Sequence, residues 1–100
     1  MRQYELYLVI DADVEEEEAS AILEKVTQLI TAGYNEQNGE VIKVEARGRR
    51  RLAYPIGKTV ESQDVILNFL APTQALPEIE RVLKLEEQLL RYLLVRVDEA

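Results

Sequence analysis

The order in which helical and strand-like hydrophobic patterns follow one another is the feature that most restricts the fold of this chain. Residues 2–10 carry apolar side chains on both alternating faces, a pattern typical of a central strand. Apolar residues at helical spacing then run as far as Gly33, and again from about residue 74 to residue 84. Further strand patterns occupy residues 40–47, which are irregular enough to indicate a bulge, and residues 64–70 and 89–97. The predicted order is therefore strand, helix, strand, strand, helix, strand.

Local signals predict where several of these elements begin and end. Asp13 is the expected N-cap of the first helix, because Glu16 follows at the capping-box position, and Gly33 is the expected stop. Asn38-Gly39 predicts a turn before the second strand. Residues 48–63 are predicted to be a long polar connection that forms the arms and tip of a hairpin.

Two helices can cover only one face of a four-stranded antiparallel sheet, so this order predicts a two-layer α+β sandwich. The arrangement is the split βαβ, or ferredoxin-like, βαββαβ fold, in which right-handed crossovers place the first and third strands in the centre. The other face of the sheet stays open, and the residues expected on it are Tyr7, Val9, Ile66, Leu70, Leu93 and Val95. A face this apolar indicates a partner rather than bare solvent.

The composition excludes several classes of chemistry. The chain has 100 residues, which fits a single domain over residues 1–100, and it contains neither cysteine nor histidine. Disulfides, thiolate metal sites and cysteine nucleophiles are therefore excluded, as is the commonest general base. No apolar run approaches the roughly 18 residues that span a bilayer, and the start of the chain, Met1 to Glu5, does not resemble a signal peptide. We therefore expect a soluble cytoplasmic protein without a membrane partner.

Charge is divided unevenly along the chain. The net charge is −7, but residues 43–58 hold six bases and one acid, for +5, whereas the remainder carries −12. Arginine suits phosphate because its planar guanidinium offers several donors and stays protonated. A solvated charge run on a hairpin explains the same pattern about equally well. Leu52, Tyr54 and Ile56 alternate within the segment, which predicts an extended arm with one apolar face.

Two motifs resemble the signatures of a known family. Met1-Arg2-Gln3-Tyr4-Glu5 and Gly48-Arg49-Arg50-Arg51-Leu52-Ala53-Tyr54-Pro55-Ile56-Gly57-Lys58 are similar to those of the bacterial small-subunit ribosomal protein six family. Length, element order and the strand end Asn68-Phe69-Leu70-Ala71-Pro72 also resemble that family. The resemblance implies a structural protein, not an enzyme. It further implies binding to the central domain of small-subunit ribosomal RNA, in the platform, as a heterodimer with small-subunit ribosomal protein eighteen.

The resemblance and the basic segment together give a set of candidate site residues. Those expected to bind RNA are Arg2, Arg47, Arg49, Arg50, Arg51, Lys58, Arg91 and Arg96. Those expected to bind the partner protein are Tyr7, Val9, Leu52, Tyr54, Ile56 and Ile66. For Tyr54 and Ile56, ordinary hairpin packing is an equally good interpretation. Two residue pairs, Gln63-Asp64 and Glu86-Glu87, depart from the sequence pattern of many members of that family.

Other interpretations remain open at this point. The alternative function is a stand-alone ferredoxin-like interaction module that forms a homodimer through its open sheet face. A small phosphate-ester hydrolase is a third, but it needs an anion-binding loop where this chain has the acidic Asp11-Ala12-Asp13. Residues 15–18 are four glutamates that point around a helix rather than converge on an ion. We therefore expect no catalytic residue, metal, cofactor or small-molecule substrate.

Overall fold

The computed structural model describes residues 1–97, and it contains the predicted elements in the predicted order. They are β1 (Arg2–Asp11), α1 (Glu16–Ala32), β2 (Glu40–Ile56), β3 (Thr59–Ala71), a 3-10 turn (Thr73–Ala75), α2 (Leu76–Leu85) and β4 (Leu89–Arg96). Within these residues, neither helix combines the length and the hydrophobicity needed to cross a membrane.

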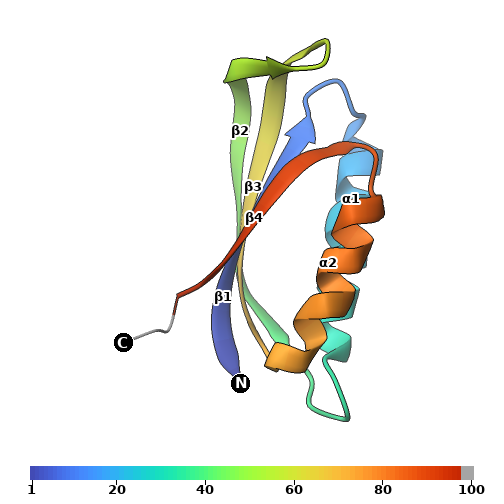
Figure 1. Ribbon diagram of the computed structural model, residues 1–100, viewed down its shortest axis with the longest axis vertical. Coiled ribbons are helices and arrows are strands. Elements are labelled where there is room, and N and C mark those ends of the chain that lie inside the picture. Colours follow the sequence, from blue (N-terminus) through green and yellow to red (C-terminus); the bar gives the residue numbers. More distant parts are fainter. Residues whose placement is uncertain (98–100) are drawn as a thin grey trace.

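The four strands form one antiparallel sheet in the order β2-β3-β1-β4, so β1 and β3 are central, as predicted. Both helices lie on the same side of this sheet, and the hairpin of β2 and β3 extends beyond them (Figure 1). The predicted ferredoxin-like α+β sandwich is confirmed. Its uncovered side, which we call the open face, is where the site described below lies.

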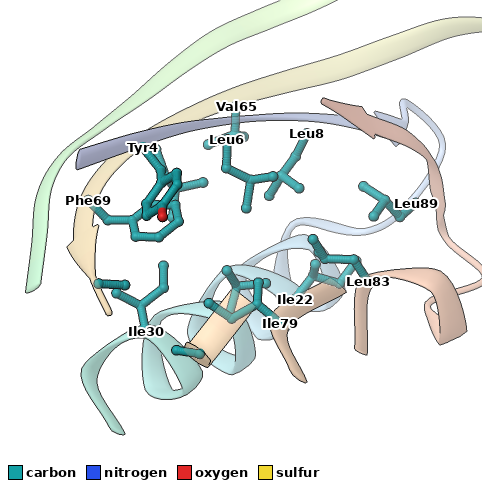
Figure 2. Packing of buried hydrophobic residues seen from close by; sticks show 14 of the residues in the cluster. Tyr4, Leu6, Leu8, Ile22, Ile30, Val65, Phe69, Ile79, Leu83 and Leu89 are labelled. Atoms are coloured by element: carbon teal, nitrogen blue, oxygen red, sulfur yellow. The ribbon is translucent and has the colours of Figure 1, made fainter. Parts of the chain in front are cut away.

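The core lies between the sheet and the two helices. Alternate residues of β1 and β3 point toward the helices, whose inward faces meet them in Figure 2. Tyr4 packs beside Phe69 with ring centroids 5.5 Å apart. The largest fully buried side chains are Phe69, Leu6, Leu8, Ile10, Ile30, Leu67, Ile79 and Val26. Because this apolar layer fixes which residues of each strand face the helices, it also fixes which ones face outward.

The start of α1 differs from the prediction. The helix begins at Glu16, its N-cap residue is the extended Glu15, and no side chain caps it. Asp13 is not the N-cap, because it lies two residues before Glu15. Its backbone N–H donates to the Asp11 carboxylate at 2.9 Å and closes a turn before the helix begins. The C-terminal prediction is confirmed: Gly33 follows the helix with a φ of 62°.

The turn after α1 also lies elsewhere than predicted. It is formed by Asn35 and Glu36, both with positive φ, and flanked by reciprocal backbone hydrogen bonds between Tyr34 and Gln37. The Asn38-Gly39 prediction is therefore wrong. Gly39 instead serves close packing, since a Cβ atom there would lie 2.2 Å from the Ile30 carbonyl oxygen.

Residues 48–63, predicted as hairpin arms and tip, belong almost entirely to β2 and β3. Gly57, with a φ of 60°, and Lys58 form the tip between the paired residues Ile56 and Thr59. The register of β2 on β3 shifts three times, which confirms the predicted irregularity. At the last shift, residues 52–55 oppose Val60 alone, so the regular alternation predicted for this arm is wrong.

Candidate functional site

The three consecutive arginines of β2 lie on two different faces of the sheet. Arg50 pairs with Ser62 of β3, which faces away from the helices, whereas Arg49 and Arg51 pair with residues of the helix-covered side. The cause is the two-residue period of a strand, which turns successive side chains to opposite faces. The run Arg49 to Arg51 therefore does not form one patch.

Arg49 is already engaged within the chain. Its guanidinium donates to both carboxylate oxygens of Glu61, at 3.3 Å each, and to the Ala12 carbonyl oxygen at 3.4 Å. An oxygen of Asp13 lies 3.6 Å away. The hydrogen bonds and charge of Glu61 raise the pKa of Arg49 above its ordinary value. Arg49 therefore joins the hairpin to the connection between β1 and α1.

The remaining predicted RNA-binding residues differ in how far they are paired. Arg47 forms an ion pair with Glu45 at 3.2 Å. In contrast, five exposed bases have side chains with no hydrogen bond or ion pair within residues 1–97, and these are Arg2, Arg50, Arg51, Lys58 and Arg91. An exposed guanidinium or ammonium without an internal partner is available to an external anion.

The predicted RNA-binding residues also fall at opposite ends of the sheet. Arg2 pairs with Ala71, and Arg96 pairs with Tyr4, so both lie at the end where β1 begins. Arg91 pairs with Val9 near the end of β1, toward the projecting hairpin. The structure thus brings Arg91 together with the hairpin arginines and separates it from Arg2 and Arg96.

A hollow of about 540 Å³ lies on the open face, between the hairpin arm and β4. Its lining combines predicted partner-binding residues with two arginine positions of the hairpin and one of β4, and consists of Tyr7, Val9, Arg50, Arg51, Leu52, Ala53, Ser62, Asp64, Arg91, Tyr92 and Leu93. Ile66 pairs with Tyr7 directly beside the hollow. Tyr54 and Ile56 do not line it, and Tyr54 is 81% exposed.

A hydrogen-bonded acid lies in the floor of the hollow. Asp64, only 6% exposed, accepts a hydrogen bond from the Tyr7 hydroxyl at 2.5 Å and another from the Ser62 hydroxyl at 2.6 Å. The hydrogen bond to Asp64, together with burial, raises the pKa of Tyr7 above its ordinary value, although Arg50 and Arg47 oppose the shift. The sequence marked Asp64 only as a departure from a family pattern, because an acid in a strand is usually a solvent-facing residue.

The open face continues along β4 as an apolar strip. Leu93 is 62% exposed and Val95 is 40% exposed, whereas Val9 is 8% exposed although no helix covers it. Within residues 1–97, no group of three acidic residues is arranged to hold a metal ion. What the described part of this face offers is apolar area and arginines.

The chain is similar in sequence and in structure to known proteins. Residues 3–96 match the family model for ribosomal protein S6. The small ribosomal subunit proteins bS6 of Moorella thermoacetica and Dictyoglomus turgidum are each 40% identical over 99 residues, which cover 99% of this chain and 97% and 98% of theirs. The crystal structure of 30S ribosomal protein S6 from Thermotoga maritima is 30% identical, with a TM-score of 0.85 over 96% of this chain and 87% of that one.

Proposed function

Since the chain belongs to the ribosomal protein S6 family, we propose that it binds small-subunit ribosomal RNA together with small-subunit ribosomal protein eighteen. As a member of this family, it is a structural component of the ribosome and not an enzyme. In the proposal it acts as one domain over residues 1–100, in the cytoplasm, at the central domain of the RNA in the platform.

The observation that carries the RNA proposal is the set of unpaired bases on the hairpin. Arg51 and Lys58 are exposed and have no side-chain partner within residues 1–97; Arg51 lies on the β2 arm of the hairpin and Lys58 at its tip. We assign the main phosphate contacts to these two residues, with Arg2, Arg47 and Arg96 extending the surface. Contacts of this kind position a protein on RNA, and the shape of the RNA supplies specificity.

The acidic body explains why a partner protein is part of the proposal. Outside the basic segment the chain carries −12, which repels the RNA backbone and leaves few contacts that release counterions. A basic partner docked on the open face adds positive charge beside the hairpin. We assign this docking to Tyr7, Val9, Leu52 and Ile66, with Tyr54 and Ile56 as additional contacts from the arm.

Titration of a central-domain RNA fragment, with and without protein eighteen, tests the proposal. We expect much tighter binding in the presence of the partner, and equal affinity in both conditions would contradict the cooperative mechanism. In the same assay Arg51→Ala combined with Lys58→Ala should weaken binding. The matched control is Arg81→Ala on α2, because Arg81 is paired with Glu78 at 2.6 Å on the helix side. Unchanged binding by the double variant would remove these residues from the RNA interface.

The exposed Leu93 and Val95 also suit a second candidate function, a homodimer formed through the open face. A stable dimer in light scattering, combined with no affinity for the RNA in the presence of protein eighteen, would favour this alternative.

A further inference from the structure

We infer that the hollow on the open face receives a segment of the partner protein in which an apolar side chain lies beside a carboxylate. Arg50 and Arg91 bind the carboxylate, and the floor of the hollow takes the apolar side chain. This inference rests on the proposed function, because it specifies what the docked partner presents. It also moves Arg50 and Arg91 from the RNA interface to the protein interface.

The shape of the hollow follows from one row across the sheet. Gly48 pairs with Asp64, Asp64 with Val9, and Val9 with Arg91. A Cβ atom on Gly48 would meet no atom within 4 Å, so the row is open at its β2 end. The irregular arm then contributes Leu52 and Ala53 to the wall. The resulting 540 Å³ far exceeds the share of one water molecule, which is about 30 Å³.

The charge at the hollow selects an anionic group. Both oxygens of Asp64 accept hydrogen bonds from within the chain, and the residue is only 6% exposed. Arg50 and Arg91 line the same hollow, are exposed, and have no side-chain hydrogen bond or ion pair within residues 1–97. The charge available to a ligand is therefore positive, although the whole chain carries −7. A carboxylate matches the planar donors of a guanidinium, whereas a basic side chain would be repelled by the two arginines.

The apolar side of the hollow favours protein over RNA. Its apolar lining is aliphatic, from the buried Val9, the partly exposed Leu52 and the exposed Leu93, and the apolar strip continues to Val95. Recognition of single-stranded RNA on a sheet of this topology uses stacked aromatic residues. Tyr92 pairs with Leu8 on the helix-covered side, and the Tyr7 hydroxyl is held by Asp64. Aliphatic side chains beside arginines are instead typical of the centre of a protein–protein interface.

The test measures the affinity of protein eighteen for charge-reversed variants by titration calorimetry. Arg50→Glu combined with Arg91→Glu should weaken the heterodimer about tenfold or more, because a like charge replaces each carboxylate contact. Arg50→Lys combined with Arg91→Lys should retain most of the affinity, since charge remains. Arg81→Glu on α2 is the matched control, and circular dichroism should show that every variant folds.

A second variant tests the apolar half of the inference. Leu93→Asp should weaken the heterodimer as well, although it leaves both arginines in place. Wild-type affinity in the charge-reversed double variant would overturn the inference. So would a loss of RNA binding with unchanged affinity for protein eighteen, because that result assigns the hollow to RNA. In contrast, an absence of binding between the wild-type chain and protein eighteen would overturn the proposed function itself.

Discussion

Removing one hydroxyl group from the floor of the hollow should measurably destabilise the fold. Tyr7→Phe deletes the donor that lies 2.5 Å from Asp64, and leaves that carboxylate with Ser62 as its remaining side-chain donor. Hydrogen bonds to charged groups contribute about 1.5–3 kcal/mol. Because water can enter the hollow and replace part of the bond, we expect a loss of about 1–2 kcal/mol. In a domain of this size, such a loss lowers Tm by roughly 4–16 °C.

The raised pKa of Tyr7 gives the same variant a second signature. The neutral phenol is favoured in the folded state by the hydrogen bond to Asp64, so the folded pKa lies above the unfolded pKa. The stabilisation is therefore complete below the unfolded pKa of about 10 and is lost as pH rises through the folded pKa. We expect the difference in stability between the wild type and Tyr7→Phe to be constant from neutral pH to about pH 9, and to shrink above pH 10.

Urea unfolding followed by circular dichroism measures both effects. The midpoint should fall in Tyr7→Phe while the slope stays unchanged, which identifies a stability effect rather than a change in the unfolded state. Tyr92→Phe is the matched control, because its hydroxyl lies at the long distance of 3.5 Å from Glu80 and should be worth about 0.5 kcal/mol or less. Equal losses in the two variants, or a Tyr7→Phe variant as stable as the wild type at pH 7, would refute the reasoning.

Three further predictions concern the hairpin and the core. Arg51→Ala should reduce the slope of log affinity against log salt in RNA titrations by about 1. Arg49→Ala should leave that slope unchanged, because the Arg49 guanidinium is held by contacts within the chain. Gly39→Ala should cost about 3 kcal/mol or more in urea unfolding, since its Cβ would clash with the Ile30 carbonyl. Phe69→Ala should cost about 3–5 kcal/mol in the same assay, because the ring is fully buried.

Most of the fold follows from the hydrophobic periodicity of the sequence. The two-sided apolar pattern of β1 identified a central strand, and the single helix-covered face followed from the count of helices and strands. The errors arose where two local signals competed for one segment. Asp13 and Glu16 form an acceptable capping box in sequence, but the carboxylate of Asp11 binds the Asp13 N–H first. Asn38-Gly39 is a good turn pair, but Gly39 is needed where two backbone segments meet.

The candidate site was less accessible to sequence reasoning, because it depends on register. The basic residues were evident from the sequence. However, the alternation of apolar and polar residues does not indicate at which strand positions a bulge occurs. The shift after Arg51 breaks the alternation of Leu52 and Tyr54, so that Leu52 lines the hollow while Tyr54 remains exposed. Asp64 carried no signal of its own. Its hydrogen bonds to Tyr7 and Ser62 exist only because β1 and β3 are neighbours.

The three consecutive arginines of β2 do not all face the same side of the sheet, and this bears on how an RNA and a partner protein share one hairpin. Arg50 pairs with a residue of the open face, whereas Arg49 and Arg51 pair with residues of the helix-covered side, although Arg51 also lines the hollow. In the proposals made above, the partner protein uses the first face and the RNA uses Arg51 and the tip. The two ligands are then assigned different guanidinium groups, although Arg50 and Arg51 both line the hollow. Because the body of the chain repels RNA, docking of a basic partner beside the hairpin raises RNA affinity through its charge without any change in the fold.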